Sequence, residues 1–317
     1  MKKHILLFSL IIIQSVAAHS VKDSIYKYNI HQFKMVIDDC DACGCSANGG
    51  SMGFSSMLNN NFTGIRYVNQ SYSTKSGIFN NSPWIDENFN TTQIWARIPI
   101  SNKIQITTLL PYHSNNRKLI TEKESIQGLG DVTLMAMYSF YETKSDSTAV
   151  VNKIQFGCGI KAPIGKYNST NNGTLNPSFQ LGTGSWDFLL VSEYVIKKKQ
   201  FGINTSLSYT FKQENQQHYQ FGDQFNYGGT LFYLLDLNKI KFVPQAGIAG
   251  EIYQSNLQFQ QKIADTKGDV VFGKLGIEIG KNKFSLGANL LMPINQNLAG
   301  GNIEAKYRFS LNVNYQL

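Results

Sequence analysis

Three cysteines lie close together near the N-terminus, at Cys40, Cys43 and Cys45. Clustered thiolates are ligands for soft metals, so this spacing predicts a site for copper(I) or zinc. The side chains of the same segment that could complete the coordination are His31, Met35, Met52 and Met57. The alternative is a local disulfide, which an oxidising compartment favours, although it leaves one of the three thiols without a partner. The sequence leaves both hypotheses open and predicts no other cofactor.

A second group of chemically active residues is charged and is spread along the rest of the chain. Each member falls at a position that we predict to face the lumen of a β-barrel, for the reasons given below. The members are Arg97, Lys153, Lys161, Glu193, Lys212, Glu251, Lys274, Glu278, Glu304, Lys306 and Arg308. Rings of charge select the solutes that pass a pore, so this set is a candidate selectivity lining. The alternative is a salt-bridged plug that fills a narrow barrel.

The motifs of common enzymes are missing from the sequence. It contains no GxSxG nucleophile elbow, no HExxH zinc motif and no P-loop. The glycine-rich run 128–131 lacks the strand–helix–strand setting of a dinucleotide-binding loop. His113 ends a strand and His218 lies in a loop, where we expect both side chains to be solvated. We therefore predict no catalytic residues and no enzymatic activity.

The elements that would position the charged residues are β-strands. From residue 60 onward, apolar and polar residues alternate with a period of two, as in strands whose two faces meet different surroundings. The clearest segment is 303–317, where every second residue from Ile303 to Leu317 is apolar and the residues between them are polar. Strands of soluble proteins are usually about 3–10 residues long, so this segment predicts a membrane-spanning strand with one face in lipid.

We count twelve such segments, an even number as in bacterial single-chain barrels. They are 62–72, 90–100, 103–113, 131–142, 151–163, 185–196, 201–211, 222–235, 240–253, 269–280, 283–294 and 303–317. Long and short links alternate between them, which is typical of the loops and turns of outer-membrane barrels. The first segment is the least regular and requires Arg66 to point inward, so fourteen strands, or ten strands plus a hairpin, stay open. The predicted fold class is all-β: a transmembrane antiparallel up-and-down β-barrel of about twelve strands with a non-barrel N-terminal segment.

The N-terminus has the features of an export signal. A basic start at Lys2 and Lys3, a short apolar run and the small residues Ala17 and Ala18 are typical of a signal peptide. We predict a signal peptide at 1–18, a cysteine-containing segment at 19–60 that plugs the lumen or lies in the periplasm, and an outer-membrane barrel at 61–317. No later apolar run approaches the length of a membrane-spanning helix.

The charge distribution argues against a nucleic-acid partner. The formal net charge is +8, but the lysines are scattered except for the run 197–199, which we expect in a solvated turn. Nucleic-acid binding needs lysines and arginines clustered on one face. The fourth cysteine, Cys158, falls among apolar outward positions, so we expect it to face lipid as a small hydrophobic side chain.

Several short motifs carry a family resemblance. They are the sequences GLGD at 128–131, APIGKY at 162–167, LNP at 175–177 and LGTGSWDF at 181–188. Over roughly residues 90–317 the chain resembles the outer-membrane β-barrel family associated with the phenol meta-cleavage pathway, which is distantly similar to the long-chain fatty-acid transporters. The many asparagines look like a Bacteroidota-type variant of that family. The resemblance implies uptake or passage of a small hydrophobic molecule, and it carries over no site residues.

The cysteine cluster is not part of that family's usual pattern, which keeps a metal-related solute open. We expect an outer-membrane channel or transporter for a small solute in a Gram-negative bacterium, with both mature termini in the periplasm. The expected partners are the solute, outer-membrane lipid and lipopolysaccharide, and the barrel-assembly machinery, which would recognise the C-terminal strand. One alternative is a structural or adhesin-like barrel with a blocked lumen. Another is a barrel that anchors a metal-binding thiol segment.

Overall fold

The computed structural model of the chain describes residues 56–58, 61–75, 82–119, 122–143, 150–171 and 176–317. The predicted signal peptide and the three N-terminal cysteines lie outside these residues. The described part is almost entirely β-structure, with two 3-10 turns, η1 (Ser169–Asn171) and η2 (Ala299–Gly301). Among the described residues, no helix has the length and the apolar composition that crossing a membrane would need.

The strands form one large antiparallel sheet and one small one. The large sheet contains β1 (Phe62–Lys75), β2 (Trp84–Pro99), β3 (Ile104–Lys118), β4 (Lys123–Leu129), β5 (Val132–Glu142), β6 (Val151–Ala162), β7 (Asp187–Lys198), β8 (Phe201–Phe211), β10 (Gln224–Tyr233), β11 (Leu235–Leu237), β12 (Ile240–Tyr253), β15 (Gly268–Lys281), β16 (Phe284–Leu298) and β17 (Ile303–Gln316). The small sheet contains β9 (Tyr219–Gln220), β13 (Leu257–Gln258) and β14 (Gln261–Lys262).

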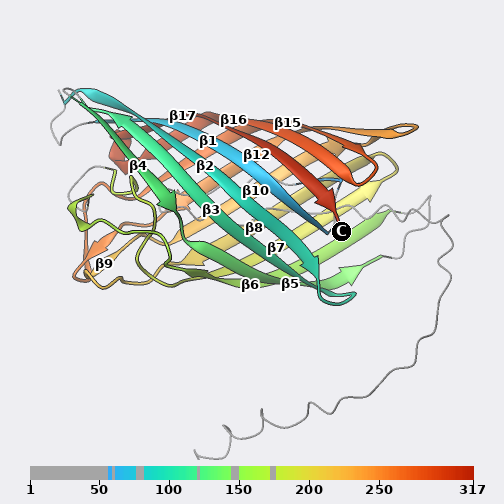
Figure 1. Cartoon of the computed structure of the whole chain (residues 1–317), viewed down its shortest axis with the longest axis horizontal. Coiled ribbons are helices and arrows are strands. Elements are labelled where there is room, and N and C mark those ends of the chain that lie inside the picture. The colour runs from blue at the N-terminus through green and yellow to red at the C-terminus, as the bar shows by residue number, and fades with distance from the viewer. Residues whose placement is uncertain (1–55, 59–60, 76–81, 120–121, 144–149, 172–175) are drawn as a thin grey trace, which may run out of the picture. The chain divides into compact units, whose positions relative to one another are not determined.

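The large sheet closes into a barrel of twelve antiparallel strands, which confirms the predicted fold class (Figure 1). Two of the twelve strands are interrupted: β4 and β5 both pair with β3, and β10 and β11 both pair with β12. The barrel closes where β1 pairs with β17, in a register that runs from Phe62 opposite Gln316 to Thr74 opposite Ile303. Closure pairs the first strand with the last, so most strands have backbone partners on both sides, while β4 and β11 pair on one side only.

The outer face of the barrel is apolar on all sides. Each of the twelve strands contributes at least one exposed large apolar side chain to it: Ile65, Ile94, Leu110, Leu134, Phe156, Leu190, Leu207, Leu231, Ile248, Leu275, Leu290 and Leu311. A continuous belt of this kind is far larger than the apolar patches that soluble proteins expose. Cys158 is exposed on this face, as the sequence predicts.

The inner face carries mostly polar residues, and they are packed against one another. Arg66, Arg97 and Arg308 are among the largest fully buried side chains of the described residues. Arg66 donates a hydrogen bond from Nε to Oε1 of Gln93 at 3.0 Å and lies 4.6 Å from the ring centroid of Trp95. These contacts confirm that Arg66 points inward, and they satisfy a guanidinium that burial would otherwise destabilise.

The two ends of the barrel differ. At the turn end, short connections join the strands at 100–103, 199–200, 238–239 and 282–283, and β17 ends there beside the start of β1. At the loop end lie the long connections 163–186, 212–223 and 254–267 together with the small sheet (Figure 1).

Two links that the sequence pattern assigned to long loops are largely strand. In the predicted link 73–89, β2 already begins at Trp84, which lies opposite Lys75. In the predicted link 114–130, β3 and β4 stay paired as far as Lys118 opposite Lys123. Polar residues occur on both faces of these hairpins, and for this reason period-two alternation does not reveal them.

Two residues of the predicted inward set point the other way. Glu304 and Lys306 are exposed on the outer face, and Lys306 pairs there with Asp86 at 2.7 Å. The cause is a β-bulge in β17, where the register to β1 jumps from Tyr307 to Ala305 and reverses the alternation. The predicted inward orientation of Glu304 and Lys306 is therefore wrong.

Candidate functional site

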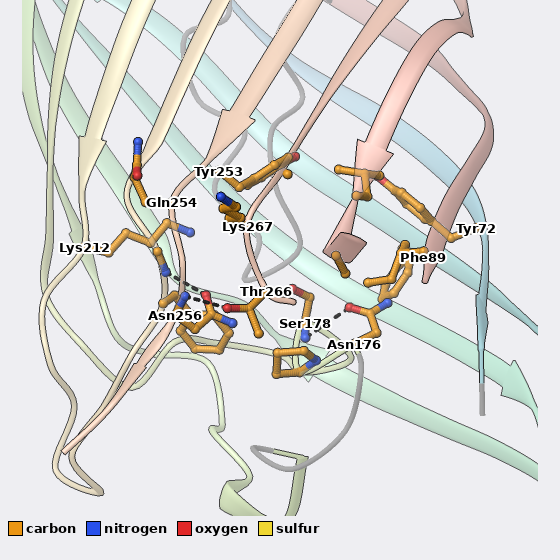
Figure 2. Close-up of a pocket in the computed structure, with 17 residues that line it drawn as sticks. Tyr72, Phe89, Asn176, Ser178, Lys212, Tyr253, Gln254, Asn256, Thr266 and Lys267 are labelled. Carbon is orange, nitrogen blue, oxygen red and sulfur yellow. Dashed lines mark hydrogen bonds between the residues drawn. The ribbon is translucent and has the colours of Figure 1, made fainter. Parts of the chain in front are cut away.

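A pocket opens into the interior at the loop end of the barrel (Figure 2). It has a volume of about 90 Å³. Its walls come from the ends of β1, β2, β12 and β16 and from the loops that fold over the barrel. A cavity of roughly 150 Å³ holds benzene, so the loop-end pocket is smaller than that space and would have to widen to hold one ring.

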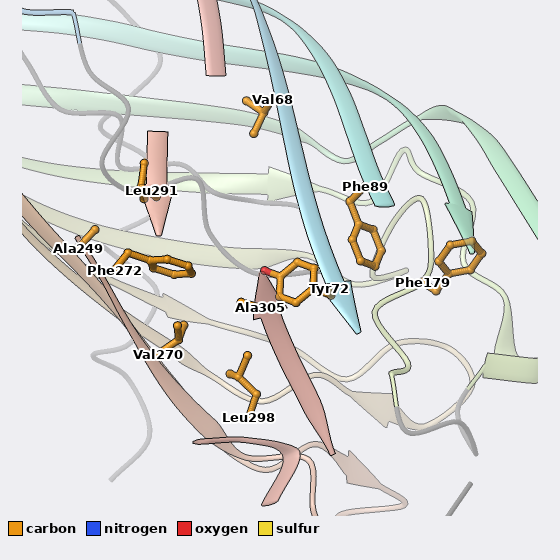
Figure 3. Close-up of a cluster of buried hydrophobic side chains, with 10 residues drawn as sticks. All are labelled: Val68, Tyr72, Phe89, Phe179, Ala249, Val270, Phe272, Leu291, Leu298 and Ala305. Carbon is orange, nitrogen blue, oxygen red and sulfur yellow. The ribbon is translucent and has the colours of Figure 1, made fainter. Parts of the chain in front are cut away.

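Aromatic and aliphatic side chains form one part of the pocket wall. Tyr72, Phe89 and Leu298 line it and belong to a buried apolar cluster on the inner face of the barrel (Figure 3). The ring of Phe89 lies 5.6 Å from that of Tyr72 and 5.9 Å from that of Phe179, which sits on the loop 163–186. The pocket therefore offers ring edges and faces to an apolar guest.

Polar groups form the opposite part of the wall. The ammonium group of Lys212 lies 5.8 Å from the ring centroid of Phe221, and both residues line the pocket. Asn256 donates from Nδ2 to the hydroxyl of Tyr219 at 2.8 Å and accepts from the amide of Gly222 at 2.8 Å. Burial raises the pKa of the Tyr219 phenol, which keeps this hydroxyl protonated. The pocket thus presents a cation and fixed amide groups beside its aromatic wall.

A buried ion pair lies below the pocket. The guanidinium of Arg308 binds Glu251 through two contacts, Nη1 to Oε1 at 2.6 Å and Nη2 to Oε2 at 2.9 Å. Both side chains are 1% exposed. Arg308 also donates from Nε to the hydroxyl of Tyr72 at 3.1 Å, and the hydroxyl of Tyr253 donates to Glu251. Since Tyr72 and Tyr253 line the pocket, this network forms its floor and lies in the lumen beneath it.

The loop 163–186 folds inward and supplies part of the pocket wall. Its residues Asn176 and Phe179 are buried, and the side-chain amide of Asn176 donates to Glu87 on β2. Glu87 also accepts a hydrogen bond from Thr74 on β1 at 2.7 Å. The guanidinium of Arg117 lies 4.4 Å from the ring centroid of Phe179. These contacts hold the loop inside the mouth of the barrel.

A second anchor of the same loop is Asp131, in the break between β4 and β5. Its carboxylate accepts from the amide of Gly165 at 3.0 Å and from the amide and hydroxyl of Thr183 at 2.8 and 2.9 Å. Lys161 lies 3.4 Å from Asp131 and pairs with Asp187. A Cβ on Gly182 would lie 2.4 Å from Oδ1 of Asp131, so only glycine fits there. Three of the motifs that carry the family resemblance therefore meet at one point.

The described residues just before the barrel lie inside it, toward the turn end. Glu278 on β15 accepts hydrogen bonds from the hydroxyl of Ser56 at 2.7 Å and from the amide of Met57 at 2.5 Å. The side chain of Met57 is buried in a cluster with Val195 and Phe232. The lumen is thus occupied at a second level, below the ion pair of Arg308 and Glu251.

Replacing Glu278 by alanine is expected to loosen this obstruction. Ser56 and Met57 each lose a buried acceptor, at a cost of about 1–3 kcal/mol per group, which raises the displaced population about tenfold or more. Swelling of liposomes in small sugars should become faster with Glu278→Ala than with the unchanged protein. The control is Glu304→Ala, which removes an exposed carboxylate from the outer face. Equal swelling rates for both variants would show that these contacts do not keep the lumen closed.

The predicted inward residues do not form a single ring of charge. Nine of them are buried: Lys212 in the loop 212–223, and Arg97, Lys153, Lys161, Glu193, Glu251, Lys274, Glu278 and Arg308 on the inner face. Of these, Glu251 and Arg308 bind each other, Lys161 joins Asp131 and Asp187, and Glu193 accepts from Asn204 at 2.7 Å. A role of the set in selectivity stays a prediction.

The two histidines differ from each other. His218 is exposed, as expected, and its Nδ1 lies 2.8 Å from Glu214. His113 is buried on the inner face with Nδ1 2.8 Å from the hydroxyl of Thr91, so the prediction that it is solvated is wrong. The reason is that β3 continues five residues beyond it, to Lys118.

The predicted metal site lies outside the described residues. Cys40, Cys43 and Cys45 belong to the part of the chain that the structure leaves undescribed, so copper or zinc binding stays a prediction. Within the described ranges, no group of three or more histidine, cysteine, aspartate or glutamate side chains is arranged to hold a metal ion.

The residues of the loop-end pocket were missed by sequence reasoning. Tyr72 and Tyr253 lie near the loop-end ends of β1 and β12, where alternation does not show which side chains line a pocket. Asn176, Asn256 and Gly222 lie in loops, where alternation gives no information. The one usable signal was the cluster of glycine-rich motifs around the loop 163–186.

Two kinds of comparison relate the chain to known proteins. The sequence profile of a family described as "Putative MetA-pathway of phenol degradation" matches residues 51–315. The structure is similar to an outer membrane channel from Pseudomonas putida F1, with a TM-score of 0.58 and 13% identity over 80% of this chain and 95% of that one. It also aligns with the CymD monoaromatic hydrocarbon channel, with a TM-score of 0.42 and 8% identity over 82% of this chain and 89% of that one. No curated protein matches the sequence. At these identities, only a shared barrel fold follows, and it follows from the first comparison alone.

Proposed function

The chain belongs to the family described as the putative MetA-pathway of phenol degradation, and from this premise we propose that it is an outer-membrane channel for a small aromatic solute. The family assignment confirms the resemblance found in the sequence. The solute we propose is a single ring that carries a polar substituent, with phenol as the simplest example. It would enter the barrel through the loop-end pocket.

The apolar outer belt supports the membrane location. A barrel whose twelve strands all expose large apolar side chains is stable in lipid and would aggregate in water. Such barrels are characteristic of bacterial outer membranes, where short turns face the periplasm and long loops face outward. In that orientation the turn end of this barrel is periplasmic, and the pocket faces the outside of the cell.

The chemistry of the pocket is the observation that carries the choice of solute. Tyr72, Phe89 and Phe221 offer ring contacts, while Lys212 and Asn256 offer polar groups across the same small space. A ring with one hydroxyl suits both parts of the wall, because its ring packs on the aromatic side chains and its hydroxyl reaches the polar groups. The volume of about 90 Å³ also argues against a long acyl chain.

Passage through the barrel requires the obstructions to move. The Arg308–Glu251 network and the residues Ser56 and Met57 occupy the lumen at two levels. We therefore propose a channel that opens when residues 56–58 leave the lumen and the Arg308–Glu251 network shifts, in preference to a permanently open pore. A structural or adhesin-like barrel would keep the same lumen closed under all conditions.

Filling the pocket is expected to weaken solute binding. In Ser178→Trp, an indole enters a space of only about 90 Å³, and overpacking of about 1–3 kcal/mol corresponds to a roughly five- to hundredfold weaker affinity. The measurement is phenol binding to the detergent-solubilised mature protein by titration calorimetry, followed by uptake of labelled phenol into intact cells.

The matched control is Ser169→Trp, which adds the same side chain to an exposed position of the same loop. It should bind phenol as the unchanged protein does. If Ser178→Trp and Ser169→Trp bind phenol equally well, the loop-end pocket is not the solute site.

A further inference from the structure

An apolar groove runs across the outer wall of the barrel, away from the loop-end pocket. Its volume is about 640 Å³, within the roughly 300–1,000 Å³ of pockets that hold small molecules. Outward side chains of Ile203, Leu231 and Leu275 form its sides, and Leu275 is 65% exposed. Phe232, an inward residue that is only 2% exposed, also lines the groove. The groove therefore reaches deeper into the wall than the neighbouring belt.

The groove exists because the sheet is interrupted there. β10 pairs with β12 as far as Phe232 opposite Gln245, and pairing resumes with Leu235 opposite Phe242. The register is the same before and after this interruption. The two residue pairs that lie between these points are opposite each other but form no backbone pairing. Pro244 stands in this gap and has no amide proton to donate. The amide of Leu234 donates instead to the carbonyl of Gln200 at 2.8 Å.

The groove ends in a strongly basic region. Three successive turns at the turn end, those of β7–β8, β11–β12 and β15–β16, carry seven lysines within or beside them: Lys197, Lys198, Lys199, Lys239, Lys241, Lys281 and Lys283. Lys197 and Lys241 stand at inward positions, which leaves five lysines for the outer wall. The same three turns and the residues beside them include one acidic residue, Asp236. Lys198 lines the groove itself. The apolar groove thus ends beside positively charged side chains of adjacent turns.

We propose that this groove binds one anionic glycerophospholipid of the leaflet at the turn end. One acyl chain lies in the groove along Ile203, Leu231 and Leu275, and the phosphate binds Lys198 and the lysines of the adjacent turns. An acyl chain matches the apolar walls and the groove's position in the belt, and a phosphodiester matches the charge at its end. The proposal uses a different surface from the loop-end pocket and rests only on the membrane location.

The test is native mass spectrometry of the full mature protein released from detergent, after addition of dioleoylphosphatidylglycerol or of dioleoylphosphatidylcholine. The two lipids have the same acyl chains and differ in net charge. We expect one phosphatidylglycerol to be retained per barrel, and several times less phosphatidylcholine. Neutralising Lys198, Lys199 and Lys239 to glutamine should reduce retention, by about fivefold for each lysine that contacts the phosphate.

A second variant tests whether the lipid occupies the apolar groove. Ala246 lies outward in the groove, so Ala246→Trp fills the space and should abolish retention. The controls are Ala136→Trp on the outer face of β5 and Lys103→Gln in the turn between β2 and β3, and neither should change retention. Loss of lipid in Ala246→Trp with normal phenol binding would separate this site from the proposed solute site.

Four results would overturn the proposal. The two lipids could be retained equally, or inorganic phosphate alone could displace phosphatidylglycerol, which would leave a headgroup site without a chain. Phenol could displace the lipid, which would make the groove a solute outlet. A dimer that disappears in Ala246→Trp would make it a contact between two copies of the chain.

Discussion

Replacing Arg308 by methionine is expected to lower the free energy of unfolding of the barrel by about 3–5 kcal/mol, because it leaves the buried carboxylate of Glu251 without its cation. The bidentate contact satisfies both carboxylate oxygens in a region that water does not reach. Tyr72 also loses the donor to its hydroxyl. The measurement is urea unfolding of the protein in lipid vesicles, followed by tryptophan fluorescence.

The double variant Arg308→Met/Glu251→Gln separates the charge effect from packing. Removing both charges should restore most of the stability, since a buried ion pair contributes little net stability over neutral side chains of similar size. The control is Lys306→Met, which breaks an exposed pair on the same strand and should change the unfolding free energy by no more than about 1 kcal/mol. If Arg308→Met behaved like Lys306→Met, the ion pair would not hold the lumen together.

Replacing Asp131 by alanine is expected to detach the loop 163–186 and to cost about 3 kcal/mol or more. Three donors lose a charged acceptor, and hydrogen bonds to charged groups contribute about 1.5–3 kcal/mol each. Lys161 also loses its contact with Asp131, while its pair with Asp187 stays. Because the loop carries Asn176 and Ser178 of the loop-end pocket, phenol binding should weaken in parallel.

Limited proteolysis of the folded protein measures whether the loop 163–186 has detached. Cleavage within 163–186 should become rapid in Asp131→Ala and stay slow in Asp86→Ala, which removes an exposed carboxylate from the pair with Lys306. A loop that stays protected in Asp131→Ala, together with an unchanged urea midpoint, would contradict the assigned anchoring role.

Alternation predicted the barrel wall well because a membrane-spanning strand has two chemically opposite faces. The segment predicted at 201–211 is β8, residue for residue, and the segment 303–317 differs from β17 only at Leu317. The pattern failed at Glu304 and Lys306, because the bulge reverses the faces while Ala305 and Ile303 suit either surrounding. A single apolar residue does not show on which side of a bulge it lies.

The candidate site was far less predictable than the wall. Alternation assigned Arg308 and Glu251 to the inside of the barrel, but it does not show how far along the barrel axis each side chain lies. The ion pair between these two residues, which are 57 positions apart in the sequence, was therefore not predicted. The pocket is built by loops that fold inward, where contacts between distant segments such as Asn176 and Glu87 decide the conformation. Local sequence patterns carry no information about such contacts.

The seam of the barrel also sets the order in which the molecule can be made. Since β1 pairs with β17, the first strand to be synthesised waits for a partner that arrives after all the others. Until then, the growing sheet has two unpaired edges and an exposed apolar surface, and both promote aggregation. Completion of the fold is therefore tied to delivery of the last strand, and a nascent chain that stops short of Ile303 should be a substrate for chaperones and proteases instead of a stable intermediate.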